Sequence, residues 1–161
     1  SVEKRKETIM REILFRGKVN NPDNISWLQQ CVGEWVEGYL LHDPDIESYK
    51  INGFNYYSSE QGLEREPFEY RVDPETIGQY TGMKDKNGEK IFEGDIVKYS
   101  TTCEIFTVAW HGSFAEFVIS ELQKPNKATR GSKDMYLVNR YCEVIGNIYD
   151  NPELLEGEEN E

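Results

Sequence analysis

The sequence predicts a mainly β protein with a small SH3-like barrel in its C-terminal half. Short runs of alternating apolar and polar residues recur along the chain, and no long stretch shows the period of an amphipathic helix. About four or five such runs follow residue 95, which suits a small barrel. We therefore expect an N-terminal β-hairpin region with short helical turns, followed by a barrel over residues 95–149.

The N-terminal region has strand patterns at residues 12–16, 35–41, 46–51 and 68–72. Asn52-Gly53 predicts a tight hairpin turn between the strand at 46–51 and a partner strand at 54–58, because this pair tolerates the positive φ angles of a type I′ turn. The polar segment 59–67 is interpreted as a loop. Trp27, Leu28 and Cys31 have the spacing of a short helical turn.

The segment Gly78–Ser100 contains several glycines and charges, which raises the question of a phosphate or calcium loop. Neither pattern fits, because Gly88 is followed by Glu89 rather than by Lys and Ser or Thr, and the calcium-loop spacing fails. We interpret Asn87-Gly88 as a turn and Gly94-Asp95 as a corner where the Asp95 carboxylate accepts backbone N–H groups. Upstream, Asp73 and Pro74 predict the cap and first residue of a helical turn.

The C-terminal half gives the strongest strand signal. Phe106, Val108 and Trp110 alternate onto one face of a strand, and His111-Gly112-Ser113 predicts a turn into a partner strand at 114–120. Further strands are predicted near residues 135–139 and 143–149. Asn151-Pro152 is expected to end the last strand.

Four blocks of the sequence resemble the YopX-like family of phage and prophage proteins. They are MREILFRGK, GEWVEGYLL, VDPETIGQYTGMKDKNGEKIFEGDIVKY and EVIGNIYDNPELL, in that order along the chain. The resemblance implies a β-rich fold and a phage or prophage origin, and it brings no assigned activity. Residues 21–32 and 124–133 are longer than in compact members of the family.

Length and charge set the expected organisation. We expect a disordered leader at residues 1–9, one YopX-like β-rich domain at 10–155 and an acidic tail at 156–161. The net charge of −12 would repel a phosphate backbone over most of the surface. No apolar run is long enough to span a membrane and no secretory signal is recognisable, so we expect a cytoplasmic protein of the bacterial host cell.

No residue pattern predicts catalysis, a cofactor or a metal site. His42 lies beside Asp43 and Asp45 in a proline-containing turn, which is a poor cage for a metal. His111 is first a turn residue. The three cysteines form no C-x-x-C pair, and we expect reduced thiols. We therefore expect no enzyme.

Two surfaces are candidates for binding. Aromatic residues crowd the middle of the chain, and the interaction face that we predict consists of Trp35, Tyr56, Tyr57 and Tyr80. A basic strip without acids is the predicted nucleic-acid contact, and its members are Lys124, Lys127, Arg130 and Lys133.

Three functional hypotheses follow. The first is a non-enzymatic binding module that acts on a host or phage protein. The second is a nucleic-acid-associated accessory protein, or an acidic mimic of DNA. The third, a small hydrolase, has least support. Exposed sheet edges also leave a homo-oligomer as an open alternative.

Overall fold

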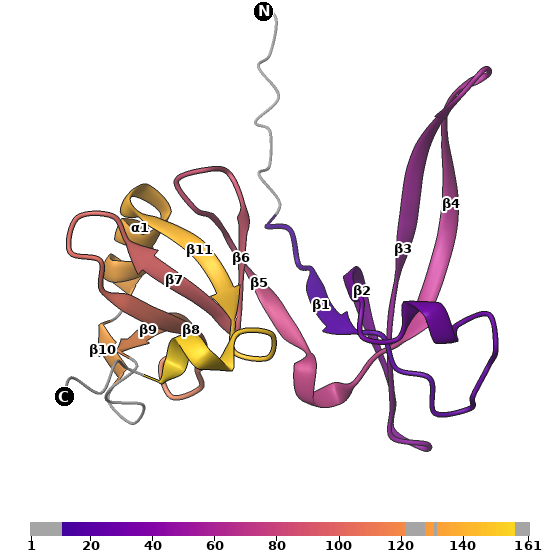
Figure 1. The fold of residues 1–161 in the computed structure, drawn as a ribbon, viewed down its shortest axis with the longest axis horizontal. Helices are drawn as coiled ribbons and strands as arrows, with labels where there is room; N and C mark the ends of the chain where they lie inside the picture. The colour runs from indigo at the N-terminus through magenta and orange to yellow at the C-terminus, as the bar shows by residue number, and fades with distance from the viewer. Residues whose placement is uncertain (1–10, 122–127, 131, 157–161) are drawn as a thin grey trace, which may run out of the picture.

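The fold is known from a computed structural model that describes residues 11–121, 128–130 and 132–156. Its strands form two antiparallel sheets, one of six strands in the order β4-β3-β2-β1-β5-β6 and one of five in the order β10-β9-β8-β7-β11. The mainly β class is confirmed. Figure 1 shows the two sheets as lobes side by side, with the β3–β4 hairpin extending away from both.

The six-stranded sheet makes the N-terminal lobe. Its strands are β1 (Phe15–Lys18), β2 (Trp35–Asp43), β3 (Ser48–Ser59), β4 (Gly62–Arg71), β5 (Gly78–Lys84) and β6 (Lys90–Phe92). Two short 3₁₀ turns interrupt it, at Gln29–Cys31 and Pro74–Thr76.

The five-stranded sheet makes the C-terminal lobe. Its strands are β7 (Asp95–Tyr99), β8 (Ile105–His111), β9 (Glu116–Glu121), β10 (Ala128–Arg130) and β11 (Cys142–Asn147). The helix α1 (Ser132–Tyr141) lies between β10 and β11, and a 3₁₀ turn at Pro152–Leu155 follows. No pairing joins the edge strands β10 and β11 among the described residues, so this sheet is open.

The main hydrophobic core lies in the C-terminal lobe. Val97, Phe106, Val108 and Ile119 pack there against the helix residues Met135 and Val138. Ile91 of β6 belongs to the same core, so the β5–β6 hairpin links the two sheets.

Turn chemistry behaves as the sequence predicts. Asp73 accepts a hydrogen bond from the Glu75 N–H, and Pro74 is the first residue of the 3₁₀ turn. Gly94 has a φ of +84°, and Asp95 accepts the Phe92 N–H at 2.7 Å. These predictions are confirmed.

Three predicted elements are wrong. Residues 135–139 are helical rather than a strand, and Met135, Val138 and Cys142 in fact have a helix-like spacing. Asn52-Gly53 is no turn, because β3 runs straight through it to Ser59. Residues 59–67 are no loop, because most of them belong to the β3–β4 hairpin. Both faces of this part of the hairpin are exposed to solvent, so the segment shows no alternation of apolar and polar residues.

A buried ion pair lies where the two lobes meet. Arg16 Nη2 of β1 is 2.6 Å from Asp95 Oδ1 of β7, and Asp95 is only 1% exposed. The Arg16 guanidinium also lies over the rings of Trp35 and Phe92, at 4.7 and 4.9 Å from their centroids. Burial raises the pKa of the Asp95 carboxyl to about 6, against the opposing pull of Arg16 and of the Phe92 N–H.

Candidate functional site

The candidate site is the outer part of the β3–β4 hairpin together with the pocket at its base. Pairing between β2 and β3 ends at Tyr39 and Asn52, while β3 and β4 stay paired out to Ser59 and Gly62. Residues 53–68, which we name the arm, therefore have no third strand. The arm extends about 20 Å beyond the last β2 pair.

One face of the arm is apolar and open to solvent. Alternation and the strand register place Phe54, Tyr56 and Leu63 on the same face, and these side chains are 45%, 64% and 74% exposed. Tyr39 of β2 continues this face towards the body of the lobe. We name these four residues the apolar arm face. Arg65 also lies on this face, and its guanidinium carbon is 4.7 Å from the centroid of the Phe54 ring, which is a cation–π contact.

The opposite face of the arm is mostly polar, and Tyr57 is its one exposed aromatic side chain. Tyr57 donates its hydroxyl hydrogen to Glu64 at 3.2 Å, and Ser59 also donates to Glu64. Tyr56 and Tyr57 thus point to opposite sides although they are neighbours in the sequence. The arm is therefore amphipathic, although its apolar face packs on no core in the described part of this protein.

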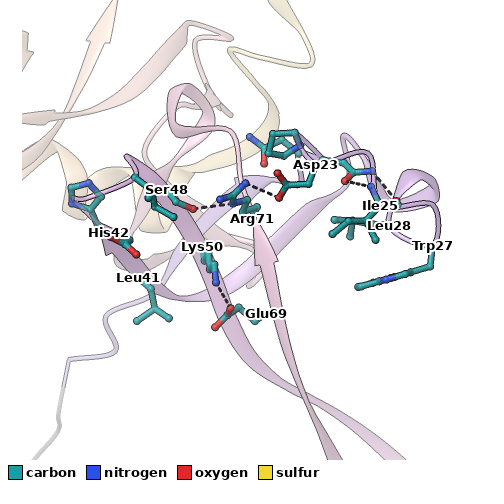
Figure 2. Close-up of a pocket in the computed structure, with 15 residues that line it drawn as sticks. Asp23, Ile25, Trp27, Leu28, Leu41, His42, Ser48, Lys50, Glu69 and Arg71 are labelled. Atoms are coloured by element: carbon teal, nitrogen blue, oxygen red, sulfur yellow. Dashed lines mark hydrogen bonds and ion pairs between the residues drawn. The ribbon is translucent and has the colours of Figure 1, made fainter.

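The base pocket, about 450 Å³ in volume, lies where the arm joins the lobe (Figure 2). Its walls come from the loop that follows β1, from the β2–β3 turn and from the inner ends of β3 and β4. The loop wall is held by Asn21, whose side chain accepts from the Ile25 N–H and donates to the Ile25 carbonyl, both at 2.9 Å. The pocket is therefore preformed.

The floor of the base pocket is polar, and its charges are paired. Lys50 lies 2.7 Å from Glu69, and Arg71 lies 2.9 Å from Asp23 while also donating to Ser48. In Figure 2 the Lys50–Glu69 pair lies between Leu41 on one side and Trp27 on the other. Among the described residues that line it, these pairings leave no free cation on the floor to hold an anionic substrate.

The rim of the base pocket is apolar. Trp27 and Ile46 are 63% and 60% exposed, and Leu41 and Ile25 are exposed beside them. Exposed apolar patches of this kind occur at binding sites for proteins and ligands.

The structure does not bring the four predicted face residues together. Tyr56 lies on the apolar arm face and Tyr57 on the other side of the arm. Tyr80 is 4% exposed and packs against Leu14 and Phe92, where burial raises the pKa of its hydroxyl.

Trp35 belongs to the contact between the lobes. Its indole N–H donates to Asp150 Oδ2 at 2.6 Å, and its ring lies 5.9 Å from that of Tyr149. Lys18 pairs with the same carboxylate. Hydrogen bonds from Lys18, Asn147 and Trp35 lower the pKa of Asp150 to about 2. Trp35 thus connects the N-terminal sheet with the turn that follows β11.

The predicted nucleic-acid strip is only partly described. Lys124 and Lys127 lie outside the described residues. Arg130 lies in β10, at the edge of the C-terminal sheet, and Lys133 lies in the first turn of α1.

Both histidines stack on aromatic rings, and of the three cysteines only Cys142 is buried. His42 stacks on Tyr49 with ring centroids 4.3 Å apart, and His111 stacks on Phe114 at 4.7 Å. Burial raises the pKa of the Cys142 thiol to about 11, which suppresses the thiolate. Within residues 11–121, 128–130 and 132–156, no group of three His, Cys, Asp or Glu side chains could hold a metal ion.

One serine of the described chain lies beside a lysine, an arrangement that some nucleophilic serines use. Lys86 Nζ donates to Ser100 Oγ at 2.9 Å. The same lysine lies 3.0 Å from Glu143, and Ser100 donates to the Tyr141 carbonyl. In this geometry the lysine donates to the serine and the serine hydroxyl donates to a backbone carbonyl, so Lys86 is not placed as the general base that a nucleophilic serine needs.

Sequence reasoning missed most of the residues that form this site. Phe54, Leu63 and Trp27 were assigned to a strand, a loop and a helical turn. The available signal was the spacing of aromatic residues in β3, because Phe54 and Tyr56 are two apart and share a face.

Comparisons with known proteins identify the family of this chain. The profile of the YopX protein family matches residues 27–156. The crystal structure of protein EF1440 from Enterococcus faecalis is similar, with a TM-score of 0.54 and 26% sequence identity, over 91% of this chain and 100% of that one. No curated protein matches. Because the profile covers most of its length, this chain belongs to the YopX protein family.

Proposed function

We propose that this protein is a non-enzymatic binding module that holds a protein of a phage or of its bacterial host through the apolar arm face. The observation that carries the proposal is a projecting two-stranded hairpin in which three of the four exposed large hydrophobic side chains, Phe54, Tyr56 and Leu63, lie on one face. A hairpin of two strands is marginally stable by itself in water, so a partner that covers this face would stabilise the arm. Aromatic residues are also enriched where proteins meet.

The binding mode that the arm favours uses side chains rather than strand addition. β4 is an edge strand of its sheet, which in principle offers free backbone groups. Pro67 lies in the middle of that edge and has no N–H to donate. A partner strand would therefore meet an interrupted ladder, while the apolar face stays fully available.

Other observations favour binding over catalysis. The charges on the pocket floor are paired, and Cys142 and the stacked histidines are poorly placed for chemistry. No helix in the described part of the chain has the length and apolarity needed to cross a membrane. We propose that the protein acts in the cytoplasm of a bacterial cell, in keeping with the phage and prophage resemblance.

The test is affinity capture from bacterial lysate and from phage-infected lysate, with and without nuclease, read by mass spectrometry. Three baits are compared: the wild-type chain, the variant Tyr56→Ser/Leu63→Ser, and the matched control Phe114→Ser. Phe114 is an exposed aromatic of the other lobe. All three baits should unfold at similar denaturant concentrations, because the replaced side chains are exposed.

We expect a protein that the wild type and the Phe114→Ser control capture, that survives nuclease, and that the arm variant loses. Capture that nuclease abolishes would overturn the proposal in favour of nucleic-acid association. Equal capture by all three baits, or no capture from either lysate, would also overturn it.

A further inference from the structure

We propose that the base pocket receives a short segment of the partner that carries bulky apolar side chains flanked by lysine or arginine. This inference rests on the proposed function and names the chemistry of the partner at one end of the same surface. Glu69 lines both the base pocket and the hollow between Tyr39 and Phe54, so the pocket continues directly into the apolar arm face.

The apolar part of this chemistry follows from the rim. Trp27, Ile46 and Leu41 surround a hollow of about 450 Å³ with largely exposed side chains. A leucine-sized side chain that enters it would remove apolar surface of both molecules from water. Because Asn21 already holds the loop wall in place, little ordering is needed when the segment binds.

The basic part follows from the balance of charge. The two cations of the floor, Lys50 and Arg71, are neutralised by Glu69 and Asp23. The β2–β3 turn beside the pocket carries three exposed carboxylates, Asp43, Asp45 and Glu47, of which Asp43 lines the pocket. Glu47 lies 3.8 Å from His42 Nε2, and within the described part of the chain no lysine or arginine pairs with any of the three. We name these three the mouth carboxylates.

Together these features select among segments. The mouth carboxylates attract cationic residues beside the buried apolar ones, and they repel acidic peptides and nucleic-acid backbones. Because these charges are exposed, their contribution is sensitive to salt, whereas the contribution of the apolar rim is not.

The experiment titrates the ¹⁵N-labelled chain with three synthetic hexapeptides, KKLLKK, KKAAKK and EELLEE, and follows amide and indole shifts by NMR. We expect KKLLKK to bind with a Kd below about 1 mM, at least about tenfold tighter than either other peptide. The shifts should centre on the loop wall and the β2–β3 turn, including the Trp27 indole.

Two variants separate the two parts of the proposal. Asp43→Asn/Asp45→Asn/Glu47→Gln should weaken KKLLKK about tenfold at about 20 mM salt and less than about threefold at about 500 mM. Trp27→Ala/Ile46→Ser should weaken it at both salt concentrations. Phe114→Ser is again the control and should leave binding unchanged.

Equal binding of EELLEE, no binding of KKLLKK at about 1 mM, or shifts centred on another surface would overturn the inference. These failures are distinguishable from failure of the proposed function, because the capture experiment uses arm variants and leaves the pocket intact. If capture of a partner depends on the arm but KKLLKK causes no shifts at the base pocket, the proposed function is retained and this inference is rejected.

Discussion

Two buried aspartates, Asp85 and Asp95, hold the turns of the segment Gly78–Ser100 by accepting hydrogen bonds from backbone N–H groups. Asp95 accepts the Phe92 N–H at the corner after Gly94. Asp85 accepts from the N–H groups of Asn87 and Glu89 in the β5–β6 turn, and its second oxygen accepts from Val144 of β11. The carboxylate of Asp85 thereby ties a local turn to a strand 59 residues further along the chain.

Replacing Asp85 with alanine should destabilise the fold by about 3 kcal/mol, because three backbone N–H groups lose their acceptor in a site with little access to water. Urea unfolding measures the loss. The matched control is Asp43→Ala, which frees one exposed N–H, that of Asp45, and should cost less than about 1 kcal/mol. Equal losses for the two variants would contradict this account, because the hydrogen bonds of the buried Asp85 would then contribute no more to stability than the exposed one of Asp43.

At the scale of elements, glycines decide how closely β3 approaches its neighbours. A Cβ on Gly38 would lie 2.1 Å from the backbone oxygen of Asn52, which has no freedom to move. A Cβ on Gly53 would meet only the tip of the Phe68 ring at 2.8 Å. Gly53 is therefore a place where an aromatic side chain crosses over the strand, as in other sheets where a ring covers a glycine.

This contrast predicts unequal effects of alanine at the two positions. Gly38→Ala should destabilise the protein by about 3 kcal/mol, since a backbone must shift to admit the methyl group. Gly53→Ala should cost no more than about 1 kcal/mol, because the Phe68 ring can rotate away. Thermal unfolding of both variants tests this, and a larger loss at Gly53 would contradict it.

The sequence predicted elements well where short-range chemistry decides them and poorly where the site lies. Asp73, Gly94 and Asp95 act through neighbours a few residues away, so their roles were predictable. The arm was not, because a strand that buries neither face shows no hydrophobic alternation, and its Asn-Gly pair resembled a turn. The helix α1 was missed because its apolar run is short, and a short apolar run does not distinguish a helix from a strand.

The candidate site depends on contacts that no local pattern encodes. The base pocket brings the loop after β1 against the inner ends of three strands, and this follows from strand register rather than from spacing. Tyr80 was predicted to contact a partner, but its side chain is buried in a small core with Leu14 and Phe92. Aromatic residues serve both purposes, and only the fold separates them.

At the scale of the molecule, the Arg16–Asp95 pair makes the attachment of the two lobes dependent on pH. The Asp95 carboxyl titrates near 3.8 when unfolded and near 6 in the fold. The folded protein thus holds this proton more tightly, so the contribution of Asp95 to stability is greatest below pH 4 and declines as the pH rises through 6.

Replacing Arg16 with methionine should destabilise the protein by about 3 kcal/mol at pH 7, because an ionised Asp95 would be left buried without its partner. At pH 5 the loss should be smaller by at least about 1 kcal/mol, since Asp95 is then largely protonated. Urea unfolding at both pH values is the measurement. Arg65→Met, an exposed arginine of the arm, is the control, and an equal loss at both pH values would contradict this account.

The central claim is that the arm is the surface through which this YopX-family chain holds its partner. Hydrogen–deuterium exchange, read on peptides that cover residues 53–68, tests it most directly when the free protein is compared with the captured complex. The account predicts fast exchange in the free arm, because this hairpin has no third strand, and strong protection in the complex. Protection confined to the C-terminal lobe, with the arm unchanged, would contradict it.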